Sequence, residues 1–207
     1  AMTVFGDLDD TRMSGMPSGR TPVATYLADS ANAAWVERTW ARAAEEIAQG
    51  HRVYVVCPRI DASDEVADAE EEGARPLASV EEVAAYLRSH PALSGIAIHE
   101  LTGRTPSPVK AQIMEDFSAG RAPLLVATTV IEVGVDVSEA TLMVILDAQQ
   151  FGLAQLHQLR GRVGRSSLPS LCIAMHRHEL TDSGRARLQA FADTTDGFEL
   201  AEADLRL

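Results

Sequence analysis

The densest group of residues able to carry chemistry lies in the segment QLHQLRGRVGR, residues 155–165. Within it, Gln158, Arg162 and Arg165 follow one another at steps of four and three, so a helix through the segment would place them on one face. Two guanidinium groups held on one face can clamp a triphosphate and stabilise the charge that develops on a phosphoryl group during its transfer. The alternative interpretation is a surface helix whose arginines are only solvated.

The two glycines of this segment favour the phosphate interpretation. Gly161 and Gly164 stand inside the expected helix, where a glycine costs about 1 kcal/mol relative to alanine. A close approach of another group to the backbone would explain both of them. We therefore expect tight packing against this part of the chain.

A second polar group follows an expected strand, in the segment ATTVIEVGVD, residues 127–136. The hydroxyls of Thr128 and Thr129, together with backbone amides at the carboxyl end of a strand, suit contacts to phosphate. Gly134 and Asp136 follow them, and a carboxylate beyond a glycine suits a ribose hydroxyl. A loop whose polar groups are capped locally explains the segment equally well.

A third group, LTGRT at residues 101–105, precedes an expected helix. Helix-terminal amides near Gly103 and the side chain of Arg104 could hold a phosphate, although this signal is weak by itself. No segment has the form G-x-x-x-x-G-K-[ST], and none has the acidic run that holds magnesium beside such a loop. We therefore expect that the chain does not hydrolyse ATP on its own.

The elements that must position these groups alternate between strands and helices. Apolar residues at helical spacing, a capping box at Ser79, and helix-ending glycines such as Gly50 and Gly120 mark the helices, while short β-branched runs mark the strands. The expected helices are residues 29–49, 80–89, 106–119, 153–163, 185–192 and 198–205, and the expected strands are 52–57, 96–101, 124–128, 141–147 and 170–176. This alternation is typical of an open α/β sheet with mostly parallel strands and helices on both faces, whose function lies at the carboxyl ends of the strands.

The composition predicts a folded domain with local contacts to any nucleic acid. With 207 residues, of which 46% are hydrophobic, the chain can bury a full core. The net charge of −12 excludes nucleic-acid binding by a broad basic surface. The acidic run at residues 61–75 predicts a solvated excursion without a catalytic role.

Two further features bear on the cellular compartment. No apolar run approaches the roughly 20 residues that span a bilayer, and the first residues lack the basic and apolar pattern of a signal peptide. Cys57 and Cys172 lie in apolar, strand-like runs without a second ligand at metal spacing. We expect buried free thiols, no metal site and a reducing cytoplasm. Ala1 ahead of Met2 indicates a segment of something longer.

Two long segments resemble motifs V and VI of superfamily 2 helicases. They are ATTVIEVGVDV at residues 127–137 and FGLAQLHQLRGRVGRS at residues 151–166, and in this wording they are similar to the RecG family and to its relative, the transcription-repair coupling factor. TVFGDLD, PSGRTPV, VYVVCPRI and DGFELAEADLRL extend the resemblance over nearly the whole chain. TVFGDLD and ATTVIEVGVDV are closer in wording to the RecG family.

The resemblance implies a fold and a domain organisation. Residues 22–178 would form the second RecA-like lobe of a helicase motor, built on an open, mostly parallel α/β sheet. Residues 1–21 would be an irregular lead-in or linker. Residues 179–207 would be the start of a translocation hairpin of two helices, cut before its end.

The resemblance also implies roles for single residues. Arg162 and Arg165 would be arginine fingers that complete the ATP site of a first lobe. The other residues implied to contact the nucleotide are Gln158, Gly161, Gly134 and Asp136. The residues implied to face the DNA backbone are Gly103, Arg104, Thr128 and Thr129. The sequence departs from the family pattern at Thr102, where a histidine is usual.

We therefore expect the chain to be the second motor lobe of an ATP-dependent helicase that translocates along double-stranded DNA. The whole protein would remodel branched DNA, such as stalled forks and Holliday junctions, in recombination and repair. ATP and Mg²⁺ would be held mainly by the first lobe. The partners would be that lobe, a DNA-binding domain of the same protein and branched DNA, with no membrane. Two alternatives remain open: the motor lobe of a transcription-repair coupling factor, and a non-catalytic α/β module whose arginine-rich helix docks an acidic protein.

Overall fold

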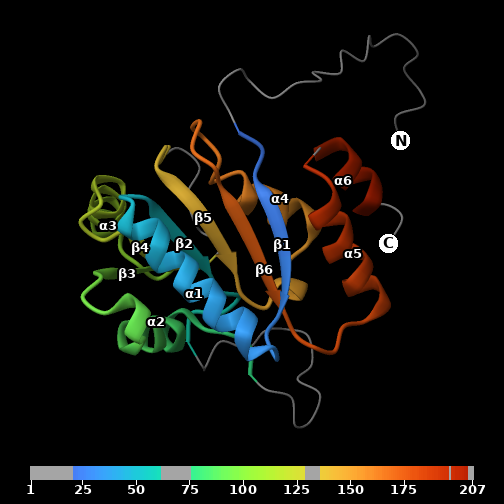
Figure 1. The fold of residues 1–207 in the computed structure, drawn as a ribbon, viewed down its shortest axis with the longest axis horizontal. Coiled ribbons are helices and arrows are strands. Elements are labelled where there is room, and N and C mark those ends of the chain that lie inside the picture. Colours follow the sequence, from blue (N-terminus) through green and yellow to red (C-terminus); the bar gives the residue numbers. More distant parts are fainter. Residues whose placement is uncertain (1–20, 62–75, 129–135, 196, 205–207) are drawn as a thin grey trace.

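Six parallel strands form one sheet in the computed structural model, which describes residues 21–61, 76–128, 136–195 and 197–204 (Figure 1). The strands are β1 (Ala24–Asp29), β2 (Arg52–Val56), β3 (Ile98–Leu101), β4 (Leu124–Ala127), β5 (Ala140–Ile145) and β6 (Leu171–His176). Their order across the sheet is β1-β6-β5-β2-β4-β3, and every neighbouring pair is parallel. The expected parallel α/β sheet is confirmed.

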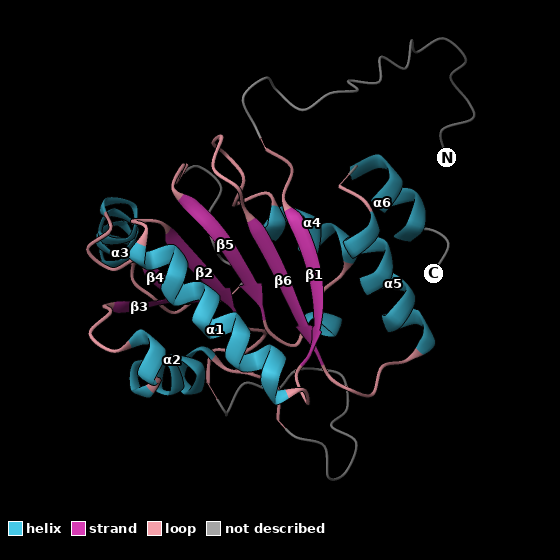
Figure 2. Ribbon diagram, in the orientation of Figure 1, coloured by secondary structure: helices cyan, strands magenta, loops and turns pink. Residues whose placement is uncertain are grey.

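Helices cover both faces of this sheet (Figure 2). They are α1 (Ala33–Ala48), α2 (Val80–Ser89), α3 (Ser107–Ala119), α4 (Leu153–Arg160), α5 (Asp182–Asp193) and α6 (Gly197–Asp204). One face packs against α1 and α2 and includes Val53 and Val55 of β2. The other packs against α3 to α6 and includes Tyr54 and Val56 of the same strand. Alternate residues of a strand thus serve opposite cores, as the two-residue period of a strand requires.

The residues expected at helix ends stand there in the structure. Ser79 Oγ accepts a hydrogen bond from a backbone N–H in the first turn of α2 at 3.3 Å. Gly50 and Gly120 follow α1 and α3 with φ of 84° and 81°, a left-handed conformation that favours glycine. Arg52 links these two ends, because its guanidinium donates to the carbonyl of Gly50 and, at 3.0 Å, to that of Phe117.

The sequence pattern does not predict the first strand. The pattern predicts irregular chain up to residue 21 and a helix from residue 29, whereas the structure has β1 at Ala24–Asp29 and begins α1 at Ala33. β1 is an edge strand that pairs only with β6, and most of its residues are partly exposed, so its apolar pattern is weak. Asn32 starts the helix, since its side chain accepts from the second and third backbone amides of α1.

The two cysteines are free and buried, as expected. Burial raises the pKa of the Cys172 thiol to about 12 and that of Cys57 further still, so neither is a reactive thiolate at neutral pH. No described helix combines the length and the apolar character needed to cross a membrane. Of the acidic run, Asp61 is described, and residues 62–75 lie outside the described residues.

A buried carboxylate ties α1 to the start of two central strands. Glu46 of α1 is 2% exposed. It accepts a hydrogen bond from Thr141 Oγ1 of β5 at 2.7 Å, lies 2.6 Å from His51 Nδ1 before β2, and pairs with Arg42 at 2.7 Å. Both carboxylate oxygens therefore have partners, and removal of the side chain would leave polar groups of the core without theirs.

We predict that Glu46→Ala lowers the free energy of unfolding by about 1.5–3 kcal/mol, because hydrogen bonds to a buried charged group are lost. Urea unfolding followed by circular dichroism measures this. Glu45→Ala is the matched control, since Glu45 precedes it on α1 but is exposed and pairs with the exposed Arg38; its unfolding midpoint should stay close to that of the unaltered chain. Equal effects of the two substitutions would contradict the role of the buried network.

The same carboxylate makes stability depend on pH. Burial raises the pKa of Glu46, but hydrogen bonds from His51, Thr141 and Arg42 together outweigh burial and leave the pKa below its ordinary value of 4.5. A carboxyl group with a lowered folded-state pKa contributes stability above its unfolded pKa and loses it as the pH falls through the folded value. The gap in unfolding free energy between the chain and Glu46→Ala should therefore shrink below pH 4.5. Urea titrations at several pH values test this, and a gap that widens in acid would refute it.

Candidate functional site

The arginines expected on a helix lie just beyond its end. α4 stops at Arg160, whereas the sequence predicted a helix to Val163. Gln158 is in the last turn of α4 and exposed, while Arg162 and Arg165 belong to the turn at residues 161–165, called the arginine turn below. The expectation that the three side chains share one helical face is therefore wrong.

The backbone of Gly164, in the arginine turn, is not helical. Its φ is 71°, which lies outside the helical range. A Cβ at this position would lie 2.5 Å from Cγ2 of Val23, just before β1. The expected close approach to the backbone thus exists at Gly164, and the group that approaches is part of the same chain. At Gly161 a Cβ would be only 3.3 Å from the carbonyl oxygen of Gln158.

The arginine turn lies beside Asp136. Arg165 Nε donates to the carbonyl of Gly161 at 2.9 Å, and Arg165 Nη1 lies 3.6 Å from Asp136 Oδ1. The Asp136 side chain is 64% exposed and that of Arg165 is 27% exposed, so the pair is open to solvent on the carboxylate side. Two segments selected separately from the sequence therefore meet in space.

Tyr54 of β2 lies within electrostatic reach of this group, and sequence reasoning did not select it. Its ring is buried and packs on Phe117 of α3 with ring centroids 4.7 Å apart. Burial raises the pKa of its phenol to about 12, while the charges of Arg162 and Arg165 lower it and that of Asp136 raises it. All three charges therefore act on one buried hydroxyl. In the sequence Tyr54 is one aromatic residue in an apolar strand, and nothing in that pattern indicates that it lies near these charges.

The residues expected to contact DNA form a second group. In the turn after β3, Thr102 Oγ1 accepts from the backbone N–H of Arg104 at 3.2 Å, and Thr105 Oγ1 accepts from that of Thr102 at 3.1 Å. Arg104 Nη1 lies 2.5 Å from Asp61 Oδ2. Thr128 follows β4, is buried, and donates its backbone N–H to the carbonyl of Leu101 at 3.2 Å. Gly103 is exposed within the same turn.

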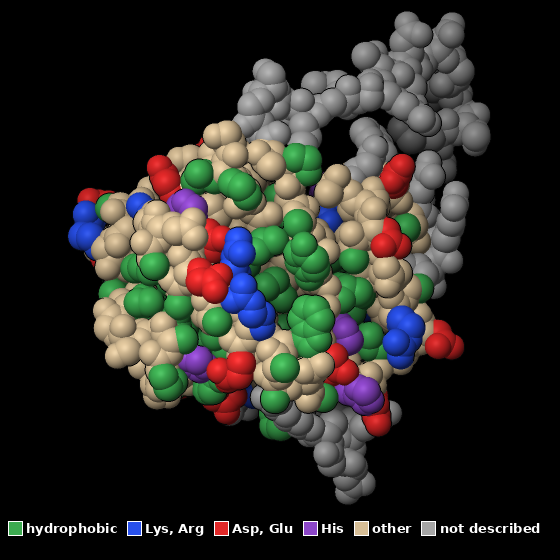
Figure 3. Space-filling view, in the orientation of Figure 1, with side chains coloured by type: hydrophobic (Ala, Val, Ile, Leu, Met, Phe, Trp, Pro, Cys, Tyr) green, Lys and Arg blue, Asp and Glu red, His purple; other side chains and the backbone are tan. Residues whose placement is uncertain are grey.

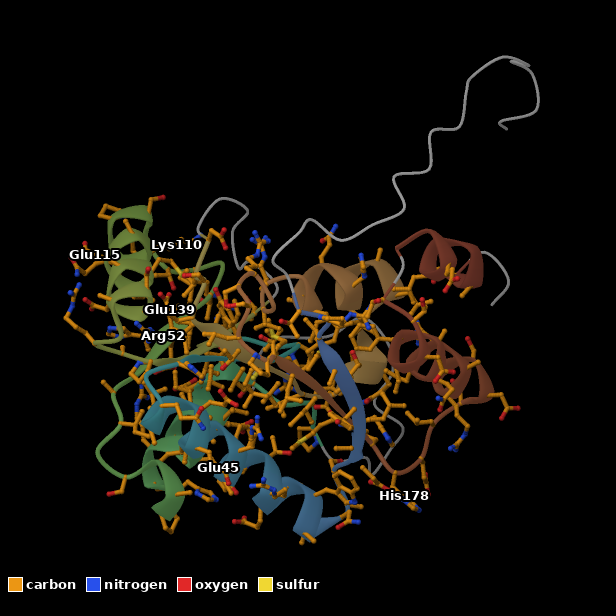
Figure 4. All side chains as sticks on the ribbon, turned by 45° about the horizontal axis from the view of Figure 1, so that its top comes forward. Glu45, Arg52, Lys110, Glu115, Glu139 and His178 are labelled. Atoms are coloured by element: carbon orange, nitrogen blue, oxygen red, sulfur yellow. The ribbon has the colours of Figure 1, made fainter. Side chains whose placement is uncertain are left out.

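The two groups lie at opposite edges of the sheet, whereas the sequence predicted the candidate residues at the carboxyl ends of the strands. Gly103, Arg104 and Thr128 follow β3 and β4, at the carboxyl edge. Asp136 precedes β5 and the arginine turn precedes β6, at the amino edge. Figure 4 marks the two edges: Arg52 and Glu139 lie side by side near the amino ends of β2 and β5, and His178 lies past the carboxyl end of β6.

Two expected site residues, Thr129 and Gly134, lie outside the described residues. Within the described ranges no group of three or more His, Cys, Asp or Glu side chains could hold a metal ion. On the face shown in Figure 3 the basic side chains are interspersed with acidic ones and do not gather into a broad field. This face therefore has no broad basic surface for nucleic acid.

Arg160 is the buried anchor of the arginine turn, and the sequence analysis did not single it out. It is 3% exposed and donates to the carbonyls of Phe191 at 2.6 Å and Thr194 at 2.9 Å, at the end of α5. Its guanidinium also lies 4.3 Å from the centre of the Phe191 ring. His157, one turn earlier, packs so closely that a Cβ on Gly197 of α6 would be 3.0 Å from its Nε2. The C-terminal helices are thus fixed to the segment that carries the arginines.

Comparison with known proteins gives the sequence context of this site. A model of the helicase conserved C-terminal domain family matches residues 37–167. The ATP-dependent DNA helicase RecG of Mycobacterium tuberculosis is 44% identical to the chain over 209 residues, covering 100% of the chain and 28% of the relative. The protein of the same name from Bacillus subtilis is 39% identical over 217 residues, with the same two coverages. The chain spans less than a third of the length of these curated relatives.

Solved structures show the same fold. RecG bound to a three-way DNA junction superposes with a TM-score of 0.72 at 34% identity, over 92% of this chain and 23% of that one. Dbp5 of S. cerevisiae bound to RNA and ADP BeF3 gives a TM-score of 0.55 at 15% identity, over 89% of this chain and 44% of that one. At that identity the second similarity concerns the fold alone. The expected RecA-like fold is confirmed.

We predict that Gly164→Ala destabilises the chain more than Gly95→Ala does. Both glycines have positive φ, 71° and 77°, so alanine at either should cost about 1–2 kcal/mol. Only at Gly164 would the new Cβ also meet Val23, whereas nothing lies within 4 Å at Gly95, and overpacking of this kind adds about 1–3 kcal/mol. Urea unfolding of the two variants measures the difference. Equal destabilisation would mean that Val23 yields and that the close approach does not fix the arginine turn.

Proposed function

The chain belongs to the helicase conserved C-terminal domain family, and from that membership we propose that it is the second motor lobe of an ATP-dependent DNA helicase that translocates along double-stranded DNA and remodels branched DNA. The observation that carries the proposal is the ion pair of Arg165 with Asp136 at the amino edge of the sheet, in the turn that also contains Arg162. The relatives described above are named ATP-dependent DNA helicase RecG, which favours this function over that of a transcription-repair coupling factor.

The amino-edge residues suit one half of an ATP site. The guanidinium groups of Arg162 and Arg165 can bind phosphate oxygens and stabilise negative charge on a phosphoryl group in transfer. The exposed carboxylate of Asp136 can accept hydrogen bonds from ribose hydroxyls, with Gln158 and Gly161 nearby on the same connection. Asp136 and the carbonyl of Gly161 hold Arg165 in place before any nucleotide arrives, so little conformational entropy is lost on binding.

The other half of the site belongs to a first lobe in this proposal. The sequence has no phosphate-binding loop of the G-x-x-x-x-G-K-[ST] type, and the described residues offer no cluster of ligands for a metal ion. ATP and Mg²⁺ would therefore be held mainly by that lobe, and this chain would supply the arginines when the two lobes close. Closure and reopening of the lobes with each ATP turned over would drive the movement along DNA.

The carboxyl edge suits the DNA backbone. The half-exposed guanidinium of Arg104 is a donor of the kind that binds phosphate oxygens without reading bases, and Gly103 and the hydroxyl of Thr128 lie at the same edge. Thr129 would join them. A relative of this fold has been solved as RecG bound to a three-way DNA junction, which supports branched DNA, such as stalled forks and Holliday junctions, as the substrate in repair and recombination.

The C-terminal helices would carry movement away from the arginines. Residues 179–207 are the start of a translocation hairpin in this proposal, after the motor lobe at residues 22–178 and the lead-in at 1–21. Arg160 supports this role, because it binds the end of α5 and is separated from Arg162 by a single residue. The two buried free thiols fit a cytoplasmic protein.

We predict that Arg162→Ala or Arg165→Ala in the full-length protein lowers the DNA-stimulated ATPase rate by on the order of 10³-fold, with ATP binding largely kept, because an arginine finger acts on the transition state. Steady-state ATPase kinetics and binding of a fluorescent ATP analogue measure the two quantities. Arg38→Ala, which removes an exposed arginine of α1, is the control and should leave both near normal.

A near-normal ATPase rate in Arg162→Ala and Arg165→Ala would remove the role assigned to the arginine turn. If those variants instead lost association with a protein partner while ATP turnover stayed intact, the non-catalytic interaction module would be the better account.

A further inference from the structure

The first acidic residue after β2 holds an arginine expected to bind DNA. Asp61 Oδ2 lies 2.5 Å from Arg104 Nη1, the distance of a charge-assisted hydrogen bond. The side chain of Arg104 is 58% exposed and that of Asp61 is 24% exposed. The acid is thus the more buried partner, and the arginine is the one that reaches further into solvent.

The strand order gives the position of this ion pair on the sheet. β4 pairs with β2 on one side and with β3 on the other. Asp61 follows β2 and Arg104 follows β3, so the contact between them crosses the carboxyl end of β4, where Thr128 lies. The ion pair therefore spans the place proposed above for the DNA backbone.

A carboxylate at this place would compete with a phosphate for the guanidinium of Arg104. Both are anions that accept hydrogen bonds from the same guanidinium, and a phosphate oxygen at Arg104 would stand beside the negative charge of Asp61. Since the pair is open to water, its energy is small and a phosphate can replace the carboxylate. The effect is a reduction of DNA affinity and not a block.

We propose that Asp61 competes with the DNA backbone for Arg104 and so raises the DNA concentration at which this lobe binds. The inference rests on the proposed function, in which Arg104 contacts DNA. It gives the start of the acidic run at residues 61–75 a role: the run begins with an internal substitute for a phosphate. Weak contacts of this lobe with DNA would then be disfavoured, and DNA held also by other parts of the protein would displace the carboxylate more readily.

The test is DNA binding by the full-length protein that carries Asp61→Asn, a change that removes the charge and keeps the shape. Fluorescence anisotropy with a labelled three-way junction gives the Kd. We expect tighter binding by about two- to fivefold at low salt, the range that an exposed ion pair can supply. The gain should shrink as salt is added, because screening weakens both the competition and the phosphate contact. Glu45→Gln is the control, since it breaks an ion pair with Arg38, which is also 58% exposed, on α1; its Kd should not change.

The Arg104→Ala variant tests the DNA contact of Arg104 separately from the competition by Asp61. We expect it to bind DNA more weakly, and Asp61→Asn added to it should bring no further gain. If Arg104→Ala weakens binding but Asp61→Asn alone leaves it unchanged or weaker, Asp61 positions the arginine, and the competition is overturned while the DNA site stands. If Arg104→Ala leaves DNA binding unchanged, the assigned DNA contact fails and the competition fails with it.

Discussion

All six strands run in one direction, and this constraint decides where every functional group lies. In a parallel sheet each connection must carry the chain from the carboxyl edge back to the amino edge. α4 begins after the carboxyl end of β5 and returns the chain to the start of β6, so the arginine turn can lie only at the amino edge. Thr128 and Arg104 follow strands directly and lie at the carboxyl edge. In the proposed function, one lobe thereby offers nucleotide contacts at one edge of the sheet and DNA contacts at the opposite edge.

The anchors of the arginine turn come from distant parts of the chain. Val23, just before β1, packs against Gly164, while the end of α5 accepts hydrogen bonds from Arg160. Tyr54, on a central strand, lies within electrostatic reach of the charges of the turn. A guanidinium group that must meet a phosphate on another lobe has to be held within a fraction of an ångström, and packing from several directions provides this. Contacts of Arg160 also join the end of α5 to the segment that carries the turn.

Local signals in the sequence predicted much of the fold and little of the geometry between segments. Ser79, Gly50 and Gly120 act through their own backbone neighbourhood, and the ends of α1, α2 and α3 were predicted within a few residues because of that. β1 was missed, since an edge strand with partly exposed residues has no strong pattern. The end of α4 was predicted three residues too late, and the close approach of Gly164 to Val23, across most of the chain, has no local signal in the sequence. The roles of Tyr54, Arg160 and Asp61 depend likewise on contacts that no local pattern encodes.

In the proposed function, this chain supplies half of a motor site. The most direct test is DNA-stimulated ATP hydrolysis by the chain alone and after mixing with a separately produced first lobe that carries the phosphate-binding loop. We expect no hydrolysis by the chain alone and measurable hydrolysis on mixing, lost again when the mixture contains Arg162→Ala. Hydrolysis by the chain alone would show that a phosphate site lies within these residues and would contradict the division of the site between two lobes.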